Sequence, residues 1–257
     1  MQNRLKCALI QPDTRWADPP ANRENLARLM EQAPGCDLYV LPETCTTGFL
    51  GNHERLSELV DDDDIGWFRD QAGQRAAAIA GSVVAGQGDR IFNRFVLARP
   101  DGNTTTYDKR HLFGFGGEGE YYTAGDARVR TELAGWKVDL QICYDLRFPV
   151  WCRNDADFDL QLFVANWPSP RVNAWSTLLR ARAIENQAYV IGVNRVGRDG
   201  KDVDYPGRSG AWDMLGETLF EADDRERVDV VTLDASKLGE VREKFRFLAD
   251  RDAFELK

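Results

Sequence analysis

The 257-residue sequence predicts a mixed α/β protein in which sheets pack together and helices cover their outer faces. Apolar runs of strand length alternate with segments of helical periodicity along the chain. A weak internal repeat supports two related halves. Residues 37–43 and 159–166 resemble each other, and each is followed by a helical segment and then by a similar strand, at Ile79 or at Val190. Since no linker-like stretch divides the chain, we expect a single domain over residues 1–257.

The first elements are expected to be a strand, a helix and a second strand. Residues 7–10 form a short apolar run, and Asp18 is followed by two prolines, as in a capped helix whose first turn holds proline. Apolar residues at 26, 29, 30 and 33 keep helical spacing as far as Gly35, a predicted helix stop. Residues 38–42 are continuously apolar, which is typical of a strand buried on both faces.

The alternation continues to the end of the chain. Strands are predicted at 79–86, 90–98, 104–107, 138–143, 159–166 and 189–196, with a turn at 100–103 and a helix from Asn173 towards Gln187. The segment 238–257 mixes charges with Phe245, Phe247, Leu248 and Phe254. Burial of exposed aromatic side chains is favourable, so we expect this segment to be a tail that docks on the chain or on a partner subunit.

Charge and composition exclude several classes of function. Lys and Arg number 33 against 42 Asp and Glu, and the resulting net charge of −9 repels nucleic acid and anionic membranes. No apolar stretch resembles a signal peptide or reaches the ~20 residues that cross a bilayer, so we expect a cytoplasmic protein. Five cysteines without a Cys-x-x-Cys pair fit reduced thiols there.

No metal site is expected. The acidic run 61–64 is more typical of a solvated helix N-terminus than of a divalent-metal site. The sequence contains only 2 histidines, so few ligands are available for a Cys/His zinc site.

Three residues with useful chemistry follow predicted strands, namely Glu43, Lys109 and Cys143. Taken singly, each has an ordinary structural explanation as a helix cap, a solvated edge residue or a small core residue. A thiol of ordinary pKa is only a few per cent thiolate at neutral pH, so a working cysteine needs a base or a positive neighbour. The three together therefore predict a nucleophilic centre.

The same residues carry a resemblance to a known family. The segments 41–43 (LPE), 107–113 (YDKRHLF) and 142–149 (ICYDLRFP) resemble the Glu-Lys-Cys signature of the carbon-nitrogen hydrolase (nitrilase) superfamily. The resemblance covers about residues 5–235 and is strongest to the omega-amidase branch, through 164–171 (VANWPSPR) among others. It implies a four-layer α-β-β-α sandwich, a homodimer, and hydrolysis of non-peptide C–N bonds with no cofactor.

The resemblance also implies roles for individual residues. In the pattern of the family Glu43 is the general base, Lys109 stabilises the tetrahedral intermediate and Cys143 is the nucleophile. A second glutamate follows the lysine, and its spacing to Thr123 favours Glu118 over the nearby Glu120.

The implied substrate is a small ω-amide of a dicarboxylic 2-oxo acid, such as 2-oxoglutaramate or 2-oxosuccinamate, hydrolysed through a cysteine thioester with release of ammonia. Tyr144, Trp167 and Phe115 are expected to bind it, and Tyr144 also offers a backbone N–H to the oxyanion. A cation must hold the carboxylate of this substrate. The candidates are Arg110, His111, Arg147 and Arg171.

Several alternatives stay open at this point. Within the same chemistry the substrate is instead an N-carbamoyl amine, deaminated glutathione or a nitrile. A catalytically silent binding protein on the same fold is a different class, which retention of Glu43, Lys109 and Cys143 disfavours. A thiol redox sensor that uses Cys143 and Cys152 requires the two sulfurs to lie within bonding reach.

Overall fold

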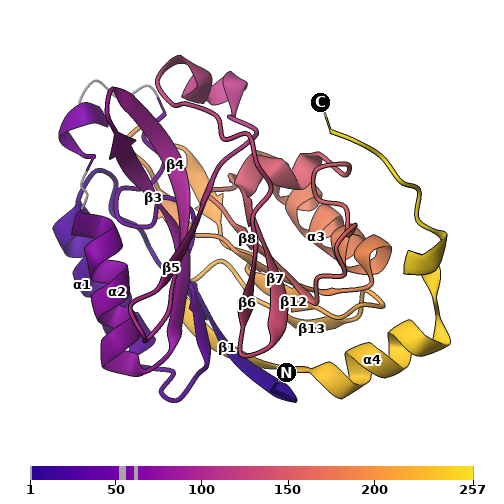
Figure 1. Ribbon diagram of the computed structural model, residues 1–257. Coiled ribbons are helices and arrows are strands. Elements are labelled where there is room, and N and C mark those ends of the chain that lie inside the picture. The colour runs from indigo at the N-terminus through magenta and orange to yellow at the C-terminus, as the bar shows by residue number, and fades with distance from the viewer. Residues whose placement is uncertain (1, 52–55, 61–62, 257) are drawn as a thin grey trace.

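The computed structural model describes residues 2–51, 56–60 and 63–256, and within them two six-stranded mixed sheets pack face to face (Figure 1). In spatial order the first sheet contains β14 (Arg227–Asp234), β1 (Arg4–Gln11), β2 (Leu38–Val40), β3 (Ala78–Gln87), β4 (Arg90–Ala98) and β5 (Thr104–Asp108). The second contains β13 (Thr218–Glu221), β12 (Gly210–Trp212), β9 (Tyr189–Val193), β8 (Leu160–Val164), β7 (Trp136–Ile142) and β6 (Arg130–Leu133). A small ribbon pairs β10 (Val196–Arg198) with β11 (Asp204–Pro206).

The two sheets repeat one topology. In the first, β1, β2 and β3 are parallel, β4 and β5 continue antiparallel, and β14 closes the other edge antiparallel to β1. In the second, β7, β8 and β9 are parallel, β12 and β13 continue antiparallel, and β6 pairs antiparallel to β7. This correspondence confirms the two related halves that the weak internal repeat predicts.

Helices cover the outer faces, which gives the α-β-β-α order of layers (Figure 1). The first sheet is covered by α1 (Pro19–Met30) and α2 (Asp63–Arg75), and the second by α3 (Val172–Asn186). Strand β1 shows why both faces are apolar: Cys7 and Leu9 enter the core between the sheets, whereas Ala8 and Ile10 pack in the cluster of α1 and α2.

The ends of the helices are set by local signals. Asp18 caps α1 and accepts from Ala21 N at 3.2 Å, as the sequence predicts. The helix ends at Met30, before Gly35, and the intervening residues form turns. The remaining helical elements are α4 (Ala235–Lys244) and the short 3₁₀ turns η1 (Leu56–Glu58), η2 (Gly114–Gly116), η3 (Glu118–Glu120), η4 (Cys143–Arg147), η5 (Ser169–Arg171) and η6 (Phe247–Asp250).

The acidic run differs in part from expectation. Asp61 and Asp62 lie outside the described residues, and α2 begins at Asp63, which confirms a helix start. Asp64, however, is fully buried, where Thr46 Oγ1 donates to it at 2.6 Å and Arg23 Nε at 2.8 Å. The prediction of a solvated run is therefore wrong for Asp64. Among the described residues no group of three or more His, Cys, Asp or Glu is placed to hold a metal ion.

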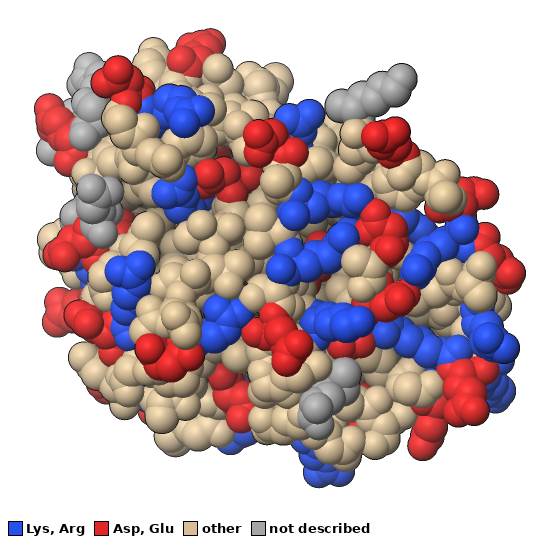
Figure 2. Space-filling view, viewed as in Figure 1, with Lys and Arg blue, Asp and Glu red and all other residues tan. Residues whose placement is uncertain are grey.

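The C-terminal segment runs along the outside of the molecule from α4 onward (Figure 1). In the same view, acidic and basic side chains are interspersed on this side of the molecule (Figure 2). Leu238 is buried, and Arg242 Nη1 donates to Asp159 Oδ1 at 2.9 Å. Phe247 remains 60% exposed. None of the helices in the described part of the chain has the length and apolar character needed to traverse a bilayer.

Asp139 in β7 is a buried carboxylate. Gln161 Nε2 donates to its Oδ2 at 2.8 Å, and Arg130 Nε approaches its Oδ1 at 3.3 Å. Burial outweighs these contacts and raises the pKa of Asp139 to about 6. In the unfolded chain this pKa is about 3.9, so the stability contributed by the protonated carboxyl is lost as the pH rises from about 4 through about 6.

We predict that the free energy of unfolding of the wild type, relative to that of Asp139→Asn, falls by about 2 to 3 kcal/mol between about pH 4 and pH 7. The asparagine cannot ionise, so the difference isolates the titration of this one group. Urea unfolding of both proteins across this pH range measures it. A difference that does not change with pH would contradict the assignment.

Candidate active site

Cys143 occupies a strained turn at the end of a buried strand. Strand β7 ends at Ile142, and Cys143 opens η4 with φ of +43°, a left-handed conformation that is unfavourable for a residue with a side chain. Such strain persists only where neighbouring contacts fix the backbone. The turn therefore presents the sulfur in a geometry that the rest of the fold enforces.

Asp145 supplies the contacts that fix this turn. Its buried carboxylate accepts from Ile142 N at 3.0 Å and from Tyr107 OH, on β5 of the other sheet, at 2.8 Å. His111 donates to Asp145 Oδ1 from its backbone N at 3.1 Å, and its ring Nδ1 lies 2.7 Å from the same oxygen. Tyr107 and His111 flank Lys109 in the sequence, so one carboxylate ties the cysteine turn to the lysine segment.

Glu43, Lys109 and Glu118 meet beside the cysteine. Glu43 follows β2, Lys109 follows β5 and Glu118 begins η3. Lys109 Nζ donates to Glu43 Oε1 at 2.8 Å and to Glu118 Oε2 at 2.9 Å, and all three side chains are at most 1% exposed. Glu120 is exposed. Of the two glutamates, Glu118 is therefore the one that contacts Lys109.

Two asparagines orient the carboxylates. Asn93 Nδ2, on β4, donates to Glu43 Oε1 at 2.8 Å and to Glu118 Oε1 at 3.1 Å. Asn166, which follows β8, donates from its backbone N to Glu43 Oε2 at 2.7 Å. Asn93 is not identified from the sequence, although an amide within an apolar strand is a signal for it. Asn166 appears in the sequence analysis only as part of a motif.

The electrostatics keep the thiol protonated and the lysine charged. Burial, and then the Glu43 carboxylate, raise the pKa of Cys143 well above its ordinary value, while the Lys109 charge only partly lowers it. Burial alone would lower the pKa of Lys109, but Glu118 and Glu43 outweigh it and raise that pKa. Cys143 is therefore a resting thiol that needs a base to react, and Lys109 is a permanent cation beside it.

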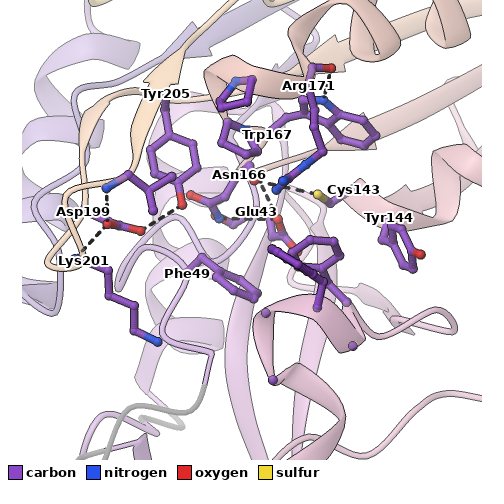
Figure 3. A pocket seen from close by; sticks show the side chains of 18 of the residues that line it. Glu43, Phe49, Cys143, Tyr144, Asn166, Trp167, Arg171, Asp199, Lys201 and Tyr205 are labelled. Atoms are coloured by element: carbon purple, nitrogen blue, oxygen red, sulfur yellow. Dashed lines mark hydrogen bonds between the residues drawn. The ribbon is translucent and has the colours of Figure 1, made fainter.

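A cavity of about 590 Å³ opens onto these groups (Figure 3). Glu43, Lys109 and Cys143 line it together with the three residues predicted to bind substrate, Tyr144, Trp167 and Phe115. Trp167 is 3% exposed, whereas Phe115 is 90% exposed and belongs to the rim. Phe49, Phe113 and Tyr205 add further aromatic surface to the walls.

The four candidate cations separate into two pairs. Arg110 Nη1 donates to Gly125 O at 3.2 Å, and the ring of His111 contacts Asp145, so both side chains are directed away from the lining of the cavity. Arg147 and Arg171 line the cavity.

A cysteine at a strained strand end, with a lysine between two glutamates at the base of a cavity in an α-β-β-α sandwich, is an arrangement suited to acyl transfer. Residues 6–243 match the carbon-nitrogen hydrolase family, and the chain belongs to this family. It is similar to "Omega-amidase YafV" of Escherichia coli strain K12, with 46% identity over 254 residues and 98% of each chain covered. It is also similar to "2-oxoglutaramate amidase" of Bacillus subtilis strain 168, with 34% identity over 250 residues, which cover 94% of this chain and 95% of that protein.

A solved structure shows the same fold. XC1258 from Xanthomonas campestris, described as a CN-hydrolase superfamily protein with an arsenic adduct in the active site, matches with a TM-score of 0.95 and 47% identity. The match covers 99% of both chains. The four-layer architecture that the sequence resemblance implies is thereby confirmed.

We predict that Asp145→Ala lowers the free energy of unfolding by about 3 to 5 kcal/mol, because it leaves several buried donors around the cysteine turn without an acceptor. Urea unfolding measures this loss. Asp108→Ala is the control: Asp108 pairs with Arg94 at the partly exposed end of β5 and is expected to contribute about 1 kcal/mol. Equal losses in the two variants would contradict the role assigned to Asp145.

Proposed function

We propose that this protein hydrolyses the ω-amide of a small dicarboxylic 2-oxo acid, such as 2-oxoglutaramate or 2-oxosuccinamate. The observation that carries the proposal is the buried group of Glu43, Lys109 and Glu118 beside Cys143 at a cavity of small-molecule size. The similarity to proteins named omega-amidase and 2-oxoglutaramate amidase supports the choice of substrate.

In the first step Glu43 acts as general base and takes the proton of the Cys143 thiol. The sulfur attacks the amide carbon, and the carbonyl electron pair moves onto oxygen. The Lys109 ammonium and the backbone N–H of Tyr144, in the first turn of η4, where N–H groups have no acceptor within the helix, stabilise this oxyanion. One such donor is worth about 3 to 4 kcal/mol of transition-state stabilisation.

In the second step Glu43 donates its proton to the amide nitrogen and the C–N bond breaks. Ammonia departs, and the acyl group remains bound to Cys143 as a thioester. Water then gives a proton to Glu43 and attacks the thioester carbon. The C–S bond breaks, the thiol regains the proton and the acid product departs. Amide and water are thus converted to acid and ammonia with no redox change and no cofactor, while Glu118 positions Lys109 through their contact at 2.9 Å.

The catalytically silent alternative is disfavoured by the site itself. Burying a lysine with two carboxylates and holding Cys143 at positive φ both cost folding free energy, and ligand binding alone requires neither. A redox role is disfavoured because Cys152 is fully buried and directed to Asp145 O at 3.1 Å.

We further propose that residues 1–257 form a single carbon-nitrogen hydrolase domain that works as a cytoplasmic homodimer. All five cysteines are unpaired, which fits a reducing compartment. Phe247 and Phe254, 60% and 37% exposed on the segment 238–257, offer apolar surface for a second subunit.

The proposed activity predicts release of ammonia from 2-oxoglutaramate by the wild type and none above background by Cys143→Ala, since the variant cannot form the thioester. Mass spectrometry of the quenched wild type is expected to show an acyl adduct that the variant lacks. An N-carbamoyl amine and a nitrile, assayed in parallel, distinguish the other substrates of the family. Activity retained by a folded Cys143→Ala protein would refute the mechanism, and silence of the wild type on 2-oxo amides would refute the substrate.

A further inference from the structure

Arg147 and Arg171 line the cavity next to Trp167, which forms part of its wall. Arg147 is the last residue of η4, the turn that Cys143 opens, and Arg171 is the last residue of η5, immediately before α3. Both side chains are partly buried. Within the described part of the chain, neither guanidinium has an ion-pair or hydrogen-bond partner; each lies over an aromatic ring.

Each of the two guanidiniums lies over an aromatic ring. Arg147 Cζ lies 4.9 Å from the centroid of the Trp167 ring, and Arg171 Cζ lies 5.0 Å from that of Phe113. Trp167 is itself held, because its Nε1 donates to Arg171 O at 2.7 Å. A ring contact of this kind uses none of the N–H donors of a guanidinium in a hydrogen bond, so those donors remain available to a ligand. Figure 3 shows the Arg171 side chain extending from this wall into the cavity.

The acidic groups of the cavity do not neutralise these arginines. Glu43 is bound to Lys109. Asp199 accepts from Val203 N and from Tyr205 OH, each at 3.0 Å, and Glu120 is exposed at the rim. The two arginines therefore present positive charge to the interior, although the whole protein carries −9.

We propose that Arg147 and Arg171 bind the free carboxylate of the substrate while its amide carbon lies at Cys143. The inference rests on the proposed function and deepens it by assigning selectivity for a singly amidated diacid to two residues. A guanidinium presents a planar fork of donors that matches a carboxylate, and a 2-oxo acid offers one further oxygen beside it. The carboxylate displaces no existing partner of either arginine.

The test compares two amides of equal length, succinamate, which carries a carboxylate, and butanamide, which does not. In Arg171→Gln and Arg147→Gln we expect kcat/KM for succinamate to fall about 10- to 100-fold, chiefly through KM, while kcat/KM for butanamide stays within about twofold. Arg180→Gln is the matched control, an exposed arginine on α3 that donates to Thr218 Oγ1, and it is expected to leave both values unchanged. Equal losses on the two amides, or none on succinamate, would overturn the proposal.

A binding measurement separates this site from the catalytic proposal. Succinamate is titrated calorimetrically into Cys143→Ala and into Cys143→Ala combined with Arg171→Gln, with thermal melting as a check on folding. We expect at least 10-fold weaker binding by the double variant. Unchanged binding would overturn the carboxylate site. If binding of succinamate depends on Arg171 but the wild type hydrolyses no amide, the carboxylate site is supported and the proposed function is refuted.

Discussion

The buried ammonium of Lys109 between the carboxylates of Glu43 and Glu118 is the constraint on which the rest of the site depends. One lysine and two glutamates, all at most 1% exposed, leave an excess negative charge inside the protein. A buried cluster of this kind is stable only when the remaining carboxylate lone pairs accept hydrogen bonds from donors held in fixed positions. Asn93 and Asn166 supply those donors. Burial, and then the Glu43 carboxylate, raise the pKa of the neighbouring Cys143 thiol and keep it protonated.

The two-sheet architecture explains how these groups reach one another. Glu43 and Lys109 follow strands of the first sheet, whereas Cys143 and Asn166 follow strands of the second. The bond from Asn166 N to Glu43 joins residues 123 positions apart and crosses between the sheets. The geometry of the site therefore depends on how the two sheets pack together. Asp145 links the cysteine turn to Tyr107 on β5 and so joins the sheets close to the sulfur.

Much of this arrangement could be predicted from the sequence, because its signals are local. The apolar runs that precede Glu43 and Cys143 identify strands, and chemistry placed just after strand ends predicts a shared site. Asn93 lies within a strand and not at its end, and the burial of Asp64 depends on Arg23 and Thr46 from other segments, so strand-end signals identify neither the role of Asn93 nor the burial of Asp64. Strand β14 is half polar, and its pairing with β1, where Cys7 is opposite Val231, is decided by tertiary context.

We propose that burial and the Glu43 carboxylate keep Cys143 protonated at rest and that Glu43 then accepts its proton. The pH dependence of alkylation at Cys143 tests this proposal most directly. The rate of iodoacetamide labelling at Cys143, followed by mass spectrometry from about pH 6 to pH 11, reports the pKa of the thiol in the wild type and in Glu43→Gln. We expect a wild-type pKa well above the ordinary cysteine value and a lower pKa in the variant, because the neighbouring negative charge is removed. A wild-type thiolate already formed at neutral pH, or a pKa that rises in Glu43→Gln, would contradict it.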